Sequence, residues 1–286
     1  MVYDSARRVL VLFGGSGDGD YNNKTYTWDG HAWQLAAVTG PTGRFGAAMA
    51  FDPIRKVTVL YGGWGWNPAP PANAPLGDTW TWDGQVWREQ HPVHNPPARA
   101  FAAMAFDSAR GVAVLFGGEG PSTTYNGTWT WDGGDWTLRQ TAHGPSPRRY
   151  AAIAYDAARQ NVVLFGGSLP GARYNDTWTW NGSDWTERLP TVRPSERALA
   201  DIAFDEKTAT TVLFGGLDAG SYPLGDTWAW DGQAWMKLSP SMSPSPRIGQ
   251  GTAYDAIAGL MVIFGGVTSA ATSEIWGWDG STWTKL

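Results

Sequence analysis

Cysteine is absent from this sequence of 286 residues. Its absence excludes disulfide bonds, thiolate metal sites and cysteine nucleophiles. Positive charge is also limited, because 21 Lys and Arg residues stand against 26 Asp and Glu residues and give a net charge of −5. No basic stripe is available to displace counterions from phosphates, so we expect no nucleic-acid partner.

Long apolar runs are missing as well. No stretch approaches the length needed to span a bilayer, and no charged segment followed by an apolar one marks a signal peptide. We therefore expect a soluble protein without membrane association, cytoplasmic or, if an upstream segment is missing, secreted. Helical periodicity is absent too, which argues against an α-helical fold.

What the sequence does contain is a repeat that occurs six times. Each copy has an aromatic residue followed by Gly-Gly, and then two tryptophans five residues apart around Asp-Gly or Asn-Gly. The tryptophan pairs are Trp28/Trp33, Trp82/Trp87, Trp131/Trp136, Trp180/Trp185, Trp230/Trp235 and Trp278/Trp283. A period near 50 residues indicates units that bury their faces only against neighbouring units.

Each repeat contains four short segments that are typical of strands. In the second repeat these are residues 45–51, the β-branched run 57–61, the alternating run 79–82, and a segment around Trp87 that follows a tight Asp83-Gly84 turn. The sequence therefore predicts an all-β, six-bladed β-propeller of four-stranded antiparallel blades. We expect one domain over residues 1–286, with blades near 1–38, 39–92, 93–142, 143–191, 192–241 and 242–286.

These residues resemble the kelch repeat, with an arginine opening the inner strand, an apolar run into Gly-Gly, an aromatic pair and a closing tryptophan. The resemblance covers nearly the whole chain and implies the repeat class of the central domain of galactose oxidase. The copper chemistry of that enzyme does not carry over, because it needs a cysteine-modified tyrosine and this chain has no cysteine. Kelch propellers also bind proteins, and a bacterial kelch-like protein is a sialic acid mutarotase, so the fold leaves function open.

The first repeat departs from the pattern. It begins at Met1, so it lacks the arginine and most of the inner strand that the other repeats have. We expect a truncated first blade, from a fragment of a longer chain or a start at an internal methionine. A ring built this way would close between blades six and one by side-chain packing alone.

Spacing within the repeat separates two kinds of connection. The first and third connections of each blade are constant in length, whereas the segment between the second and third strands varies. In an up-and-down meander the constant turns lie on one face, and the variable segments lie on the other with the links between blades. Because variable loops on a rigid scaffold often carry function, we expect the ligand on the variable face.

An arginine lies eight residues before the aspartate that ends the inner strand in five repeats. By strand direction these residues surround the channel opening on the variable face, where guanidinium groups would attract carboxylates. The alternative, which the regular recurrence favours, is that each arginine pairs locally and fixes a link between blades. The five residues are Arg44, Arg99, Arg148, Arg197 and Arg247.

Residues that break the repeat are stronger functional candidates. Trp64 and Trp66 lie outside the repeated tryptophan positions, in the longest variable loop, where they would stack on a sugar ring or anchor a peptide. The alternative is that they pack this proline-rich loop onto blade two. Glu119 follows a Gly-Gly pair, at a position that is chemically diverse among the repeats.

Asp201 replaces a small residue of the inner strand, and Gln250 does so at the neighbouring position. We expect the Asp201 carboxylate to pair with an arginine or, alternatively, to face channel water. The histidines, including His91 and His94 of an HxxH loop segment and His143, lack the spacing of a zinc site on a helix. We therefore expect no metal and no cofactor.

The favoured function is a non-catalytic binding module that docks a peptide or protein segment on the variable face. The five arginines suggest an acidic segment. A carbohydrate-binding or sugar-processing protein is the alternative, with Trp64 as platform and Glu119 or Asp201 as acid and base. A third interpretation is a scaffold or a fragment that has no specific ligand. We recognise no catalytic motif and expect a monomer that binds a protein, a peptide or a glycan.

Overall fold

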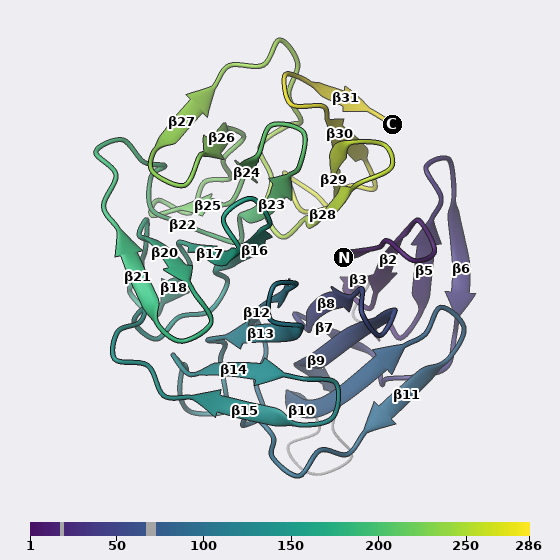
Figure 1. The fold of residues 1–286 in the computed structure, drawn as a ribbon. Coiled ribbons are helices and arrows are strands. Elements are labelled where there is room, and N and C mark those ends of the chain that lie inside the picture. Colours follow the sequence, from purple (N-terminus) through teal and green to yellow (C-terminus); the bar gives the residue numbers. More distant parts are fainter. Residues whose placement is uncertain (18–19, 67–72) are drawn as a thin grey trace. The chain divides into compact units, whose positions relative to one another are not determined.

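The computed structural model describes residues 1–17, 20–66 and 73–286. These residues form six blades of mostly four antiparallel strands and no helices, so the chain is an all-β, six-bladed β-propeller (Figure 1). None of them forms a helix long and apolar enough to cross a membrane. The chain divides into two compact units of three blades: Met1–Gln140 with Ser146–Arg149, and Thr141–Pro145 with Tyr150–Leu286.

The first unit holds blades 1 to 3, each built from strands that pair in chain order. Blade 1 is β1 (Val2–Asp4), β2 (Val9–Phe13), β5 (Thr25–Trp28) and β6 (Trp33–Ala37). Blade 2 is β8 (Ala48–Asp52), β9 (Val57–Trp66), β10 (Asn73–Trp82) and β11 (Trp87–Gln90). Blade 3 is β12 (Ala103–Asp107), β13 (Val112–Phe116), β14 (Thr128–Trp131) and β15 (Trp136–Arg139). Short strands β3 (Ser16–Gly17), β4 (Asp20–Tyr21) and β7 (Arg44–Phe45) accompany them.

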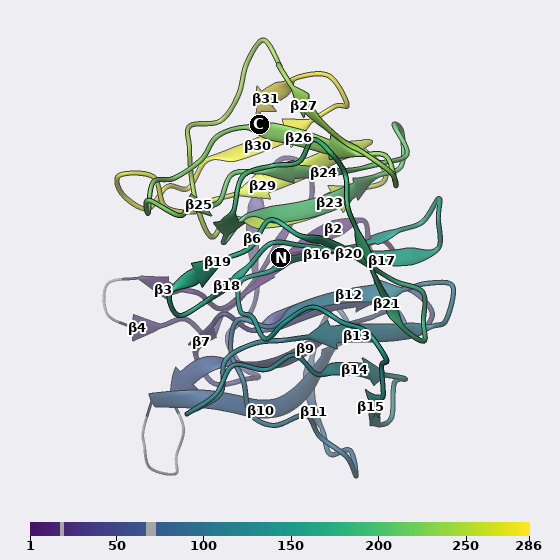
Figure 2. The same cartoon turned by 90° about the vertical axis from the view of Figure 1, so that its left-hand side faces the viewer.

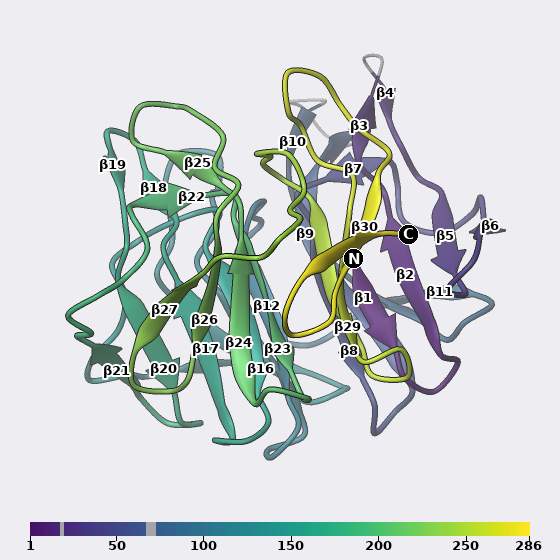
Figure 3. The ribbon, with the colours of Figure 1, turned by 90° about the horizontal axis from the view of Figure 1, so that it is seen from above.

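The second unit repeats this plan in blades 4 to 6. Blade 4 is β16 (Ala152–Asp156), β17 (Asn161–Phe165), β20 (Thr177–Trp180) and β21 (Trp185–Arg188). Blade 5 is β23 (Asp201–Asp205), β24 (Thr210–Phe214), β26 (Thr227–Trp230) and β27 (Trp235–Leu238). Blade 6 is β28 (Gly251–Asp255), β29 (Leu260–Phe264), β30 (Ile275–Trp278) and β31 (Trp283–Lys285). Short strands β18 (Ser168–Leu169), β19 (Ala172–Arg173), β22 (Arg197–Ala198) and β25 (Leu217–Asp218) lie at one end of its blades (Figure 3).

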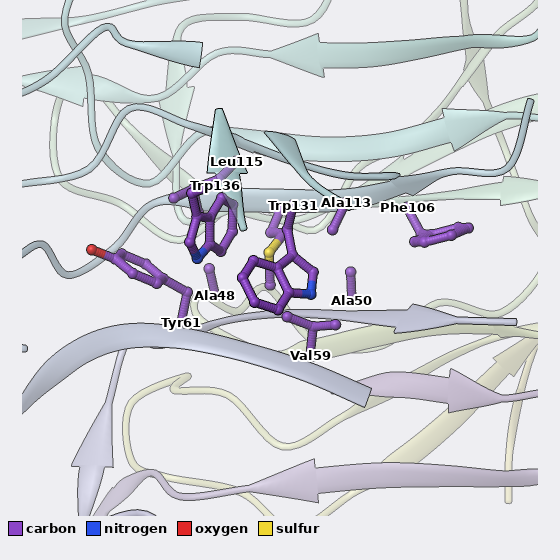
Figure 4. Close-up of a cluster of buried hydrophobic side chains, with 10 residues drawn as sticks. Ala48, Ala50, Val59, Tyr61, Phe106, Ala113, Leu115, Trp131 and Trp136 are labelled. Atoms are coloured by element: carbon purple, nitrogen blue, oxygen red, sulfur yellow. The ribbon is translucent and has the colours of Figure 1, made fainter. Parts of the chain in front are cut away.

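Tryptophans from the repeat form the seams between neighbouring blades of a unit. The Trp136 ring packs edge-on against the Tyr61 ring of the preceding blade, with 5.2 Å between ring centroids, and its Nε1 donates to Thr79 Oγ1 at 2.9 Å (Figure 4). In the second unit Trp235 makes the same two contacts with Phe165 and Thr177. The repeated aromatic residues are therefore core residues that join one blade to the next.

The turn between the first two strands also joins blades. The Asp156 Oδ2 accepts a bond of 2.8 Å from Arg159 Nη1, which donates as well to the carbonyl oxygen of Ala209 in the following blade. In the first unit Asp4, Arg7 and Lys56 form the same arrangement. In blades 1 and 4, the aspartate that ends the first strand thus organises both its own turn and the contact with a neighbour.

The longest variable segment is more regular than the sequence indicated. Residues 64–66 and 73–78, expected as loop, continue β9 and β10 as a paired ribbon, and residues 67–72 lie outside the described part of the chain. The expected inner strand 45–51 is divided, because Gly46 has a φ of +63° and separates β7 from β8. In the first unit, β4, β7 and the ends of β9 and β10 lie toward the same side (Figure 2).

Candidate functional site

The end of the blades that carries the Gly-Gly pairs is organised by the predicted arginines. These five residues, which we call the repeat arginines, have 0–1% of their surface exposed: Arg44, Arg99, Arg148, Arg197 and Arg247. Each of the five follows one scheme. Its N–H and C=O bond to the variable segment of the preceding blade, and its side chain bonds to its own blade.

Arg44 illustrates the scheme in the first unit. Its amide N donates to the Asn22 carbonyl at 3.2 Å, and its carbonyl accepts from Gly15 N at 2.9 Å. Its Nη1 donates to the Gly62 carbonyl at 3.0 Å. Asp78 accepts from both Nη1, at 2.6 Å, and Nη2, at 2.8 Å, so this ion pair is bidentate.

Blades 5 and 6 repeat the side-chain contacts. Arg197 forms a bidentate pair with Asp226, and Arg247 donates from Nη2 to Glu274 Oε2 at 2.7 Å. Ser195 and Ser245, two residues before each arginine, accept further bonds from Nη2. These contacts fit the alternative in which the repeat arginines fix links between blades. Ligand binding by the repeat arginines stays a prediction.

The glycines next to these contacts are required by space as well as by conformation. Gly62 has a φ of +62°, and a Cβ there would lie 2.4 Å from the carbonyl oxygen of Arg99. Gly63, next in the chain, donates its N–H to the same carbonyl at 2.9 Å. Only glycine allows the backbone of one blade to approach the next this closely.

Three aromatic side chains that sequence reasoning did not single out form a row across blades 1 to 3. The row consists of Tyr21, Phe45 and Phe101, all partly exposed. The ring centroids of Tyr21 and Phe45 are 5.5 Å apart, and those of Phe45 and Phe101 are also 5.5 Å apart. The aromatic row is therefore a continuous apolar strip at the Gly-Gly end of the first unit.

Phe101 has an unusual backbone. Its φ is +59°, in the left-handed region that a bulky residue rarely adopts. The same position, two residues after the repeat arginine, also has a positive φ in the other repeats that contain this arginine. The residues there are Gly46, Phe101, Tyr150, Leu199 and Gly249. Comparing this one position among the repeats would have identified Phe101, together with Tyr150 and Leu199, as a departure from glycine.

Trp64 and Trp66 lie beside the aromatic row. Trp64 pairs with Phe45 in the β7–β9 ladder and is partly exposed, and Trp66 ends β9 with 52% of its surface exposed. Successive residues of a strand alternate between faces, so Trp64 and Trp66 share one face of the ribbon. Because Phe45 stands directly opposite Trp64, its side chain belongs to that face too.

Glu119 and Asp201 occupy separate units and different environments. The Glu119 carboxylate, 26% exposed, forms an ion pair with Arg149. Asp201 lies at the start of β23 and accepts a bond from Ile202 N at 3.0 Å. No arginine pairs with Asp201 within the part of the chain that the structure describes, and burial raises the pKa of its carboxyl to about 6. Gln250 instead donates to the Phe214 carbonyl at 3.0 Å.

Two of the four histidines pair with an aspartate of the neighbouring blade. His94 Nδ1 lies 2.7 Å from Asp135 Oδ2, and His143 Nδ1 lies 2.8 Å from Asp184 Oδ2. Across residues 1–17, 20–66 and 73–286, no group of three or more His, Asp or Glu side chains is arranged to hold a metal ion.

Comparison with known proteins adds no assignment to this geometry. No protein-family model matches the chain, and no curated protein is similar to it at a significant level.

Proposed function

We propose that this chain is a kelch-type propeller that acts as a non-catalytic binding module, with its ligand docked on the aromatic row of the first unit. The aromatic row carries this proposal, because three adjacent rings from three blades remain partly exposed at the variable end. Aromatic anchors of this kind supply much of the affinity at protein interfaces. The proposed ligand is accordingly a peptide or protein segment with an apolar side chain at its centre.

The backbone of Phe101 is a second observation that bears on the proposal. A left-handed conformation costs a residue other than glycine about 1–2 kcal/mol. Gly46 and Gly249 avoid this cost at the same position of other repeats, whereas Phe101, Tyr150 and Leu199 do not. Of these three, Phe101 is the one whose ring belongs to the aromatic row of the first unit. Strain of this kind is often retained where a side chain serves binding. We infer that the Phe101 ring is kept for contact with the ligand.

The buried repeat arginines change the character of the expected ligand. Arg44, for example, has 1% of its surface exposed and a bidentate carboxylate partner. Its charge is already balanced, so it gives an acidic ligand little to bind. The aromatic row therefore favours an apolar segment over the acidic one that the sequence suggested.

A carbohydrate is the second candidate, favoured by Trp66. This indole is half-exposed and shares a strand face with Trp64 and Phe45, which suits stacking on a sugar ring. Glu119 and Arg149 would supply polar groups for hydroxyls of such a ligand. A glycan array therefore forms part of the test.

The test selects ligands from a displayed peptide library and from a glycan array, and then measures their affinity for Phe101→Gly. Because Gly46 and Gly249 already hold this backbone conformation, Phe101→Gly should fold with unchanged or higher melting temperature. We expect the Kd of the selected peptides for Phe101→Gly to rise by at least about tenfold. This rise corresponds to a loss of about 1.4 kcal/mol in binding free energy.

Leu199→Gly is the matched control, since it changes the same repeat position in the other unit and should leave peptide affinity unchanged. Peptides that bind Phe101→Gly as well as the unaltered protein would overturn the proposal. Glycans that bind the unaltered protein and are lost on Trp66→Ala, with no peptide selected, would establish the second candidate instead.

A further inference from the structure

Blade 3 lacks the carboxylate that pairs with the repeat arginine in blades 2, 5 and 6. The acidic residue stands immediately before the first residue of the Thr-Trp or Ile-Trp pair of the third strand, as Asp78, Asp226 and Glu274. We call this place in each blade the acidic position. In blade 3 it is occupied by Gly127.

The arginine of blade 3 is buried nonetheless. Arg99 has 1% of its surface exposed, and its Nε and Nη1 donate to the carbonyls of Pro97 and Gly117 at 2.9 and 2.8 Å. No carboxylate pairs with it among the residues that the structure describes, and burial lowers its pKa from the ordinary value. Blade 3 therefore holds a buried cation without the anion that other blades provide.

The Nη2 group of Arg99 also lacks the hydroxyl acceptor that this group has in other blades. In blades 2, 5 and 6 a hydroxyl two residues before the arginine accepts from Nη2, through Thr42, Ser195 and Ser245. The corresponding residue of blade 3 is Pro97, which has no hydroxyl. The Tyr125 ring lies over the guanidinium at 4.2 Å, but it covers a face of the group. Carboxylates bind guanidinium in its plane, where the N–H donors point.

A tryptophan supplies another donor toward the same place. The acidic residue in blades 2, 4, 5 and 6 accepts a bond of 2.7–3.2 Å from the indole Nε1 two residues later, donated by Trp80, Trp178, Trp228 and Trp276. The equivalent indole in blade 3 is Trp129, and its Nε1 lies 3.3 Å from where a Cβ on Gly127 would be. Within the described residues Trp129 Nε1 has no acceptor.

The acidic position is also open to solvent. The side chains of Asp78, Asp226 and Glu274 are 24%, 19% and 31% exposed although their arginine partners are buried. Gly127 is itself partly exposed, so a group from solution can reach the space beside it.

From these observations we propose that the acidic position of blade 3 is a binding site for a carboxylate group, held by Arg99 and by Trp129 Nε1. The bound carboxylate takes the place that Asp78 fills in blade 2. It comes from a small free carboxylate or from the acidic side chain of a peptide. This site uses none of the residues of the aromatic row, so the two proposals stand or fail separately.

The test follows the indole N–H signals of the ¹⁵N-tryptophan-labelled protein at neutral pH, with the Trp129 signal assigned through Trp129→Phe. One arm titrates sodium acetate against sodium chloride at equal ionic strength. The other arm titrates a capped Ala-Glu-Ala peptide against its Ala-Gln-Ala counterpart. We expect a saturable shift of the Trp129 signal with acetate, with the glutamate peptide, or with both, and none with chloride or the glutamine peptide.

Gly127→Asp is the deciding variant, because it supplies the missing carboxylate from the chain itself. Gly127→Asp should abolish the shift of the Trp129 signal and raise the melting temperature. Gly127→Asn is a second variant, which fills the same space and should also abolish the shift. The reciprocal change, Asp226→Gly, should open the same site in blade 5. Acetate should then raise the melting temperature of this variant. An absent shift in both arms, a shift that survives both Gly127 variants, or an equal response to chloride would overturn the proposal. Which arm responds identifies the source of the carboxylate.

Discussion

Arg197 shows how much of this fold depends on single buried charges. Its guanidinium bonds to two carbonyls, a serine hydroxyl and both oxygens of Asp226, while its backbone bonds to Tyr174 and Gly167 of the preceding blade. Removing one member of a buried ion pair is costly because the remaining charge has no solvent to replace its partner. The charge of Asp226 is therefore structural.

Asp226→Asn should lower the free energy of unfolding by about 3 kcal/mol, because Arg197 would keep its charge without a balancing anion. Chemical denaturation monitored by tryptophan fluorescence measures this change. Asp231→Asn is the control in the same blade, since Asn181 already holds the equivalent turn of blade 4 with bonds of 2.9 Å from two amides. Equal losses in the two variants would contradict the structural role of the Asp226 charge.

At the scale of elements, a side-chain contact between strands of neighbouring blades recurs along the chain. The fourth-strand tryptophan of one blade packs, edge-on or tilted, against the aromatic residue before Gly-Gly in the preceding blade, and it donates a hydrogen bond to the first threonine of that blade's third strand. In the second unit Trp235, 2% exposed, makes these contacts with Phe165 and Thr177. Apolar burial and a directed hydrogen bond together fix how two adjacent blades align.

Trp235→Phe should lower the free energy of unfolding by about 2 kcal/mol, because the buried Thr177 hydroxyl loses its donor. Adding Thr177→Val should restore part of this loss, since both partners are then apolar. Urea denaturation of the single and double variants measures both effects. Trp66→Phe, at a half-exposed position, should change stability by less than about 0.5 kcal/mol. An equal loss in the free energy of unfolding for Trp66→Phe would contradict a specific contribution of the contact between Trp235 and Thr177.

At the scale of the whole molecule, acid should weaken the fold through carboxylates paired with buried or neighbouring cations. Lys285, Arg247 and Trp276 all donate to Glu274 and together lower the pKa of its carboxyl from 4.5 to about 2. A carboxyl whose pKa is lower in the folded state stabilises that state above its unfolded pKa. This contribution is lost as pH falls from about 4.5 to about 2.

The difference in stability between the unaltered protein and Glu274→Gln should accordingly be constant above about pH 5 and should shrink as the pH falls toward 2. Urea midpoints at a series of pH values measure it, with the ionic strength held constant. A difference that stays the same down to pH 2 would show that Glu274 is not stabilised as a carboxylate.

Much of the fold was predictable from the sequence because it depends on local patterns repeated six times. Alternating Thr-Trp runs, turn residues and a constant spacing predict strands, their order and their number without knowledge of long-range contacts. Gly46 and the β9–β10 ribbon were missed, because a residue's φ and the pairing of a proline-rich segment depend on the neighbouring blade.

The sequence by itself determined the six-bladed, all-β architecture and the core role of the repeated tryptophans. Only the tertiary structure decided where the departures from the repeat lie and what they contact. It buried the repeat arginines against their own blades, brought Tyr21, Phe45 and Phe101 together from three blades, and left Arg99 facing a glycine. The physical reason is that burial and charge pairing join residues tens of positions apart, and a sequence pattern records each residue only beside its chain neighbours.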